Sequence, residues 1–255
     1  MTRSLREGRI CMQAQSYTSE ILAGMQRVEE SWKRVRDCVQ EAAIRAGRDP
    51  AEVRLMAVTK TVEPVYINHA ISLGATLIGE NKVQEYLSKK PSLEGAYEAH
   101  LIGHLQTNKV RQIVGEVDVI QSVDSVKLAR EIGKVSEKKG VVSDVLLEVN
   151  IGLDPNKFGI LPDALEETAC EIAEIPGVRV CGLMTVPPFD ADLEKTRRFF
   201  SNMRQLYIDI TEKKIHNIFM HILSMGMSGD YPQAIAEGAT LVRVGTAIFG
   251  SRNYR

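Results

Sequence analysis

Short apolar runs alternate with segments of helical periodicity along most of the chain. Eight runs have strand length and are rich in valine, isoleucine, leucine and methionine, and they cover residues 54–59, 75–79, 99–103, 117–122, 144–150, 178–184, 219–224 and 240–244. Helical spacing recurs between them, near residues 64–73, 82–89, 106–114, 125–139, 162–174, 190–213 and 230–237. This alternation predicts parallel strands joined by helical connections. Since many of the runs are apolar at nearly every position, we expect a sheet that is buried on both sides.

A long amphipathic helix precedes the first strand. Apolar residues recur at helical spacing from about residue 20 to residue 46, and Gly47 follows at the position of a C-terminal cap. Eight strands with seven intervening helices leave one helix missing near the C-terminus, and the N-terminal helix can replace it. We therefore predict an α/β fold, a single (β/α)8 barrel of the TIM type in which residues 20–46 cover the seam between the eighth and first strands.

An open, doubly wound sheet is the alternative architecture. Such a sheet more typically has a GxGxxG motif after its first strand, and this chain has none. No linker rich in glycine, serine or proline divides the chain, so we expect residues 20–255 to form one barrel domain. Residues 1–19 contain three arginines but no apolar run like that of a signal peptide, and we expect them to form a flexible extension.

Composition and charge narrow the range of partners. The formal net charge is -1, and because the signs are mixed along the chain we expect no nucleic acid or membrane partner. The four cysteines show no CxxC pair or zinc-ligand spacing, which fits a reducing cytoplasm and predicts no metal site. We therefore expect a small-molecule ligand and a monomeric, cytoplasmic protein.

Polar residues follow several of the predicted strands, where the active site of such a barrel lies. Lys60 ends the first strand, and there its ammonium group either contacts water or takes part in chemistry. The loops after strands seven and eight often bind phosphate in these barrels. Here those loops contain hydroxyl groups and glycines at Ser224, Gly226, Ser228, Gly245 and Thr246. The pattern therefore indicates an anion site at the barrel mouth, although each loop alone could need these residues only for its turn.

Two further features have structural alternatives. Arg243 lies inside an apolar run, where an unpaired guanidinium is costly, and Glu148 of the fifth strand is a candidate partner across the barrel. His100 and His104 are four residues apart but flank a strand and a loop, and no HExxH motif is present. We interpret the two histidines as hydrogen-bonding or packing residues.

A series of motifs, in order from about residue 25 to the end, resembles the YggS/PROSC family of pyridoxal phosphate (PLP) homeostasis proteins. The motifs are Ala57-Val-Thr-Lys60, Ile78-Gly-Glu-Asn81 with Val83-Gln-Glu85, His100-Leu-Ile-Gly103, Leu105-Gln-Thr-Asn-Lys109, Gly182-Leu-Met184, Ser224-Met-Gly-Met-Ser228 and Val242-Arg-Val-Gly-Thr-Ala-Ile-Phe-Gly250. One departure is Lys82, where the family commonly has tyrosine.

The resemblance implies a barrel like the N-terminal domain of fold-type III PLP enzymes such as alanine racemase. It implies that Lys60 is the Schiff-base lysine, that Arg243 faces the pyridine nitrogen and that Asn81 lies beside the cofactor ring. Ser224, Gly245 and Thr246 would bind the phosphate. Gly226 completes the implied cofactor-binding set, with Lys157 and Met225 as secondary contacts.

Three functions follow as hypotheses. The one we favour is a PLP-binding homeostasis protein that stores, buffers or delivers the cofactor, possibly to PLP-dependent apo-enzymes, without dedicated turnover. An arginine at the pyridine nitrogen opposes ring protonation and so weakens the ring as an electron sink. The alternative is an amino-acid racemase, but the related two-base racemases use a tyrosine from a second domain that this sequence does not include. A Schiff-base aldolase without a cofactor is a third possibility.

Overall fold

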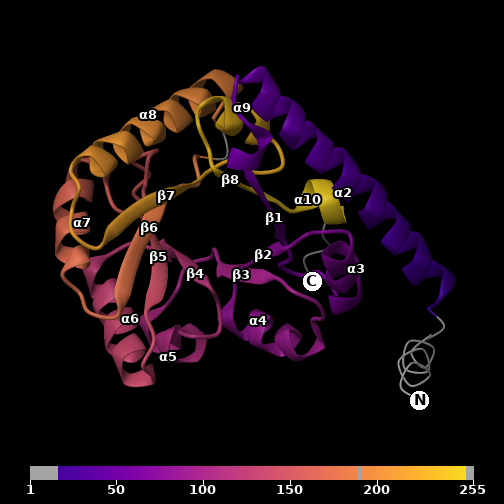
Figure 1. The fold of residues 1–255 in the computed structure, drawn as a ribbon, viewed down its shortest axis with the longest axis horizontal. Coiled ribbons are helices and arrows are strands. Elements are labelled where there is room, and N and C mark those ends of the chain that lie inside the picture. Colours follow the sequence, from indigo (N-terminus) through magenta and orange to yellow (C-terminus); the bar gives the residue numbers. More distant parts are fainter. Residues whose placement is uncertain (1–16, 189–190, 251–255) are drawn as a thin grey trace, which may run out of the picture.

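Eight parallel strands close into a barrel in chain order, β1 to β8, in the computed structural model, which describes residues 17–188 and 191–250 (Figure 1). The strands are β1 Arg54–Val58, β2 Leu77–Glu80, β3 Glu98–Leu101, β4 Val119–Val123, β5 Ser143–Glu148, β6 Val178–Met184, β7 Ile218–Ser224 and β8 Leu241–Val244. Each strand pairs in parallel with its sequence neighbours, and β8 pairs with β1 from Arg54↔Leu241 to Ala57↔Val244. The closed (β/α)8 barrel predicted from the alternation is therefore confirmed, and the open sheet is excluded.

Helices surround the barrel on its outer side (Figure 1). They are α2 Ser19–Arg45, α3 Pro64–Ser72, α4 Val83–Lys89, α5 Val110–Ile113, α6 Val126–Lys139, α7 Leu165–Ala173, α8 Leu193–Glu212, α9 Tyr231–Ala236 and α10 Thr246–Phe249. The helix predicted near residues 106–114 forms as the 3-10 turn Thr107–Lys109 followed by the short α5. The helix predicted from residue 190 begins at Leu193, because the Asp192 side chain caps it by accepting a hydrogen bond from the backbone N–H of Lys195 (2.7 Å).

The N-terminal helix α2 closes the barrel as predicted. It packs against α9, which precedes β8, and against α3, which follows β1, so it covers the seam between β8 and β1 (Figure 1). Thr18 caps its start by accepting from the backbone N–H of Ile21 (3.3 Å). At its buried face, the Trp32 indole donates to the backbone oxygen of Leu73 (3.2 Å). The expected extension 1–19 falls mainly outside the described residues.

Two apolar clusters form the core. The larger lies between the strands and the helices, and the smaller fills the barrel interior with Met56, Val58, Leu146, Met184, Ile222 and Leu241 among its members. Side chains alternate along a strand, so every second residue of β1 points inward. The inward series of β1 is Met56 and Val58, and Lys60 continues it two residues later. The strand period therefore directs the Lys60 side chain toward the barrel mouth.

Candidate functional site

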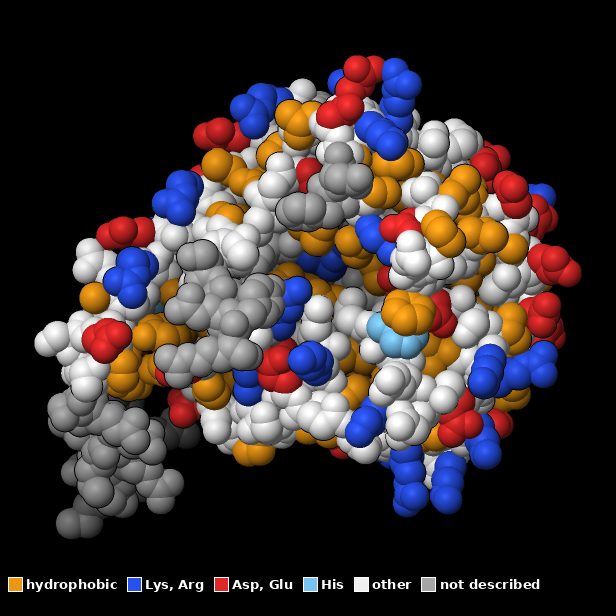
Figure 2. All heavy atoms as spheres, turned by 180° about the vertical axis from the view of Figure 1, so that it is seen from behind, with side chains coloured by type: hydrophobic (Ala, Val, Ile, Leu, Met, Phe, Trp, Pro, Cys, Tyr) orange, Lys and Arg blue, Asp and Glu red, His pale blue; other side chains and the backbone are white. Residues whose placement is uncertain are grey.

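A cavity of about 700 Å³ opens at the carboxyl ends of the strands. The face turned away from the viewer in Figure 1 is hollowed near its centre, and Lys or Arg side chains lie inside the hollow (Figure 2). Five residues of the implied cofactor-binding set line the cavity, namely Lys60, Asn81, Arg243, Gly245 and Thr246. Its remaining wall includes Val58, Ile102, Pro187, Leu193, Ser228 and Asp230. The structure thus brings together polar groups from loops that lie far apart in the sequence.

Asn81 reaches the cavity because β2 and β3 approach closely at their ends. Gly103 follows β3, and a Cβ atom on this residue would lie 2.3 Å from the backbone oxygen of Asn81. Any larger side chain would therefore push Asn81 away from its place. The Ser122 hydroxyl holds the same turn by donating to the backbone oxygen of Gly103 (2.7 Å). The glycine in the motif that ends β3 consequently has a packing role at the site.

Arg243 is the cation at the floor of the cavity, with only 3% of its surface exposed. Its Nη1 donates to the hydroxyl of Ser224 (2.5 Å) and its Nη2 to the backbone oxygen of Thr185 (2.8 Å). Burial lowers the pKa of Arg243 to about 10, while the carboxylates of Glu148 and Asp230 oppose this change. The guanidinium therefore stays charged at neutral pH. Within the described chain its hydrogen bonds go to these two oxygens, and Glu148 acts on it through charge alone.

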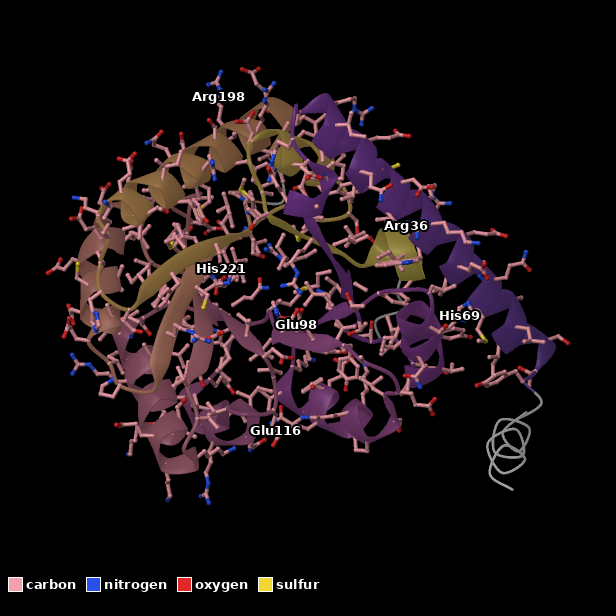
Figure 3. The ribbon with its side chains drawn as sticks, in the orientation of Figure 1. Arg36, His69, Glu98, Glu116, Arg198 and His221 are labelled. Carbon is pink, nitrogen blue, oxygen red and sulfur yellow. The ribbon has the colours of Figure 1, made fainter. Side chains whose placement is uncertain are left out.

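A chain of buried polar side chains runs from Arg243 across the barrel interior. The Ser224 hydroxyl donates to Oε1 of Gln121 (2.7 Å), and Nε2 of Gln121 lies 2.8 Å from Nδ1 of His100. Burial lowers the pKa of His100, so its ring is neutral and Nδ1 can accept from the Gln121 amide. Glu98 lies two residues before His100 on the same face of β3, toward the barrel centre (Figure 3). These bonds hold the Arg243 guanidinium in one orientation.

The predicted phosphate residues separate into two groups. Gly245 and Thr246 line the cavity, together with Ser228, whose Oγ accepts from the backbone N–H groups of Gly245 (3.2 Å) and Ala247 (3.4 Å). Ser224 is fully buried, does not line the cavity, and directs its hydroxyl toward Gln121. The hydroxyl that faces the cavity in the loop after β7 is therefore that of Ser228.

Gly226 and Met225 support the loop after β7 on the side away from the cavity. A Cβ atom on Gly226, which has a φ of +91°, would lie 2.5 Å from the Cβ of Ala234 in α9. The backbone oxygen of Gly226 accepts from the N–H of Arg243 (3.0 Å). Met225 is fully buried in the outer core cluster. Neither residue lines the cavity, but Gly226 joins the loop after β7 to β8 where Arg243 lies.

Lys157 does not line the cavity itself but contacts a residue that does. It belongs to the loop after β5, which Asn150 closes by donating to the backbone oxygen of Asp154 (2.7 Å). The Lys157 ammonium donates to the backbone oxygen of Pro187 (3.2 Å), and Pro187 lines the cavity. Lys157 therefore links two loops at the rim. The exposed side chain of Lys82 is not among the lining residues.

Glu148 carries a carboxyl group at the carboxyl-terminal end of β5. Burial raises the pKa of Glu148 to about 7, the Asp124 carboxylate adds to this rise, and Arg243 opposes it. A carboxyl whose folded pKa exceeds its unfolded value stabilises the fold below the unfolded pKa and loses this contribution as the pH rises to the folded value. The contribution of Glu148 should thus decline between about pH 4.5 and pH 7.

We expect Glu148→Gln to remove this pH dependence. A rise from 4.5 to about 7 corresponds to about 1 to 3 kcal/mol of unfolding free energy after allowance for solvent screening. Urea unfolding at pH 5 and pH 8 measures it, and the glutamine variant should gain stability relative to the wild type at pH 8. A constant difference between the two proteins at both pH values would contradict the prediction.

The loops after β3 and β5 are joined by a stacked ring pair. His104 stacks on Phe158 with ring centroids 3.6 Å apart, and its Nδ1 lies 3.3 Å from Oδ2 of Asp124. This geometry agrees with a packing and hydrogen-bonding role for His104. Across residues 17–188 and 191–250, no three His, Cys, Asp or Glu side chains are grouped as metal ligands, and no helix is both long and apolar enough to cross a membrane.

Gln121, Thr185 and Asp230 are the site residues that the sequence analysis missed. Gln121 lies in a run of buried strand residues and points inward, and a polar residue at such a position was the available signal. Thr185 contributes its backbone oxygen, which no side-chain pattern reveals. Asp230 lines the cavity while its Oδ1 accepts from the backbone N–H of Met227 (2.5 Å), a turn contact that requires the folded loop.

Comparison with known proteins gives three results. Residues 33–253 match the family described as alanine racemase, N-terminal domain. A pyridoxal phosphate homeostasis protein of Aquifex aeolicus (strain VF5) is 42% identical over 226 residues, which cover 88% of this chain and 98% of that protein. The structure of PipY from Synechococcus elongatus with PLP bound has a TM-score of 0.74 and 33% identity, covering 84% of this chain and 100% of PipY.

A solved structure of an unknown protein from Bifidobacterium adolescentis is also similar. Its TM-score is 0.85 at 37% identity, and the match covers 89% of this chain and 96% of that one. The family match, over residues 33–253, spans all eight strands and the loops that line the cavity.

Proposed function

Since the chain belongs to the family of pyridoxal phosphate homeostasis proteins, we propose that it binds PLP at the barrel mouth through Lys60 and serves to hold and release the cofactor. The observation that carries this proposal is the combination of three groups in one cavity. Lys60 offers an amine, Arg243 a buried cation, and the loops after β7 and β8 offer hydroxyl and backbone N–H groups. PLP presents an aldehyde, a pyridine nitrogen and a phosphate, which match these three groups.

The residues of the cavity fit the cofactor in size and chemistry. The volume of about 700 Å³ is within the range of small-molecule sites. The neutral amine of Lys60 would condense with the aldehyde of PLP and release one water. Gly245, Thr246 and Ser228 would contact the phosphate, and Asn81 would contact the ring. When bound, the cofactor supplies an electron-withdrawing ring, and the charge on Arg243 opposes protonation of the ring nitrogen.

The buried, hydrogen-bonded side chains next to Arg243 favour binding of the cofactor over catalytic turnover. Ser224 and Thr185 fix the guanidinium with two hydrogen bonds, so it keeps its charge and its place beside the cavity. A fixed cation that keeps the ring nitrogen unprotonated leaves the ring a weaker electron sink, so proton abstraction from a bound amino acid is less favourable than with a protonated ring. We propose storage, buffering or delivery on this basis, with PLP-dependent apo-enzymes as recipients.

An assay for racemisation separates this function from the racemase alternative. The purified protein loaded with PLP is incubated with single enantiomers of several amino acids, which are then followed by chiral chromatography. We expect negligible interconversion. Steady turnover of about 1 per second or faster, lost in Lys60→Ala, would establish a racemase. If the protein shows no visible absorbance after dialysis against PLP, the result would favour the hypothesis of an aldolase without a cofactor.

The phosphate contact is tested by two serine variants. Ser228→Ala removes the hydroxyl that faces the cavity and should weaken PLP binding by about 1.5 to 3 kcal/mol, the range for a hydrogen bond to a charged group. Pyridoxal, which has no phosphate, should bind weakly to the wild type and equally weakly to this variant. Ser224→Ala acts through Arg243 instead, so it should weaken both ligands. Equilibrium dialysis of the three proteins with each ligand measures these affinities, and equal binding of PLP and pyridoxal by the wild type would refute the phosphate site.

A further inference from the structure

The segment around Lys60 is held from outside the barrel wall by an ion pair in α4. Lys89 and Glu85 lie one helical turn apart in α4 with Nζ and Oε1 2.5 Å apart. Lys89 is only 11% exposed and Glu85 20%. Behind them, Glu80 at the end of β2 is almost fully buried, and its Oε1 lies 2.9 Å from the same ammonium. Lys89, Glu85 and Glu80 thus meet on the outer side of the barrel, next to the segment that joins β1 to Lys60.

This ion pair binds both peptide groups that flank Lys60. On the first side, the Lys89 ammonium donates to the backbone oxygen of Thr59 (2.9 Å). On the second side, the backbone N–H of Thr61 donates to Oε1 of Glu85. The Thr59 hydroxyl also donates to Glu80 (2.8 Å). The backbone on either side of the Lys60 Cα is therefore fixed by the same cluster of side chains.

The backbone at Thr61 is strained, so contacts that fix its conformation are needed. Thr61 has a φ of +60°, a conformation that β-branched residues rarely adopt. Its side chain is exposed, so packing does not impose this conformation. Two hydrogen bonds hold it: the Val62 N–H donates to the backbone oxygen of Thr59 (3.0 Å) across the turn, and the Thr61 N–H donates to Glu85. Burial alone would raise the pKa of Glu85, but the bonds from Lys89 and Thr61 outweigh it and hold the pKa below its usual value.

We propose that Lys89 and Glu85 are positioning residues that aim the Lys60 side chain into the cavity. Neither residue lines the cavity, so both act through the backbone of Lys60. The proposal rests on the proposed function of Lys60 as the residue that binds PLP covalently. A small misplacement of a reacting group lowers the rate of bond formation strongly. Loss of the ion pair should therefore weaken the covalent attachment of PLP without changing the cavity itself.

The neighbouring residue offers a matched control. Lys90 follows Lys89 and makes an ion pair of similar length with Glu116 (2.9 Å), but it contacts neither Thr59 nor Thr61. Lys89→Met and Lys90→Met each remove one ammonium group from the same stretch of chain, the first with its ion pairs to Glu85 and Glu80 and the second with its ion pair to Glu116. Lys89→Arg keeps a charge that can reach the same oxygens. A difference between the two methionine variants therefore reports the contacts around Lys60.

Two ligands separate positioning from a general effect on the cavity. Pyridoxine 5'-phosphate shares the ring and phosphate of PLP but lacks the aldehyde, so it cannot condense with Lys60. We expect Lys89→Met and Glu85→Gln to slow attachment of PLP, followed by visible absorbance, about tenfold or more. Their affinity for pyridoxine 5'-phosphate should stay within twofold of the wild type. Lys90→Met should match the wild type with both ligands, and Lys89→Arg should recover most of the rate.

Equal losses for both ligands in Lys89→Met, or the same behaviour in Lys89→Met and Lys90→Met, would overturn the proposal. A second measurement needs no ligand: the exchange rate of the Thr61 amide hydrogen, followed by NMR, should rise about tenfold in Lys89→Met and Glu85→Gln but not in Lys90→Met. If the wild type attaches no PLP to Lys60, the proposed function fails. The amide exchange then still decides whether the ion pair fixes this segment.

Discussion

Replacing Lys60 with alanine should abolish the visible absorbance of the protein with PLP and all labelling by borohydride. The reason is that, among the residues that the structure describes, Lys60 is the lysine that lines the cavity: Lys157 is bonded to the Pro187 oxygen at the rim, and Lys89 lies outside the barrel wall with three acceptors. The fold should persist, because Lys60 is only partly buried and belongs to neither apolar cluster. Absorbance spectra and peptide mapping after reduction measure the effect.

A matched control for this experiment is Lys82→Ala. Lys82 is an exposed lysine at the start of α4. It follows β2, the strand next to the one that precedes Lys60, but it does not line the cavity. This variant should keep the absorbance and the label. Reduction that attaches PLP to Lys82 or Lys157 in the wild type would show that Lys60 is not the anchoring residue. Thermal unfolding of Lys60→Ala close to that of the wild type excludes a loss through misfolding.

The order of elements was predictable because burial on both sides leaves continuous apolar runs. The run predicted at 240–244 contains Arg243, which the structure places in β8, and the run predicted at 54–59 placed Lys60 just after the first strand, which ends at Val58 in the structure. Strand ends were less certain: β2 begins at Leu77, two residues later than predicted, and β5 ends at Glu148, two residues earlier. Apolar residues also occur in turns, so hydrophobicity alone does not mark where pairing starts or stops.

The contacts of the site depend on geometry that no sequence pattern contains. Ser224 and Ser228 lie in one motif and are chemically alike, yet the first is buried against Gln121 and the second faces the cavity. Only the course of the loop distinguishes them. The contacts of Lys89 with Thr59 and Glu80 join a helix to two strand ends. A lysine at this helical position reads from sequence as an ordinary solvent-facing residue.

Arg243→Met should destabilise the protein more at high pH than at low pH. The variant leaves the backbone oxygen of Thr185 without its donor and removes the cation that lowers the pKa of Glu148. The first loss costs about 1 to 3 kcal/mol at every pH. The second raises the folded pKa of Glu148 above about 7, so the variant continues to lose stability as the pH rises above about 7, where the wild type no longer does.

The pH-dependent part of this deficit should shrink in the double variant Arg243→Met with Glu148→Gln, because Glu148 can no longer ionise and Asp230 is the carboxyl that still acts on this position. Residues in contact through charge are expected to be non-additive, so the double variant should be more stable at pH 8 than the sum of the two single changes predicts. Arg243→Glu should be the least stable of the series, since it adds a carboxylate to a floor where Glu148 and Asp230 already act on this position. Urea unfolding of the cofactor-free proteins at pH 5 and pH 8 measures every member. A deficit of the same size at both pH values would show that Arg243 acts only through its hydrogen bonds and that Glu148 is not its electrostatic partner.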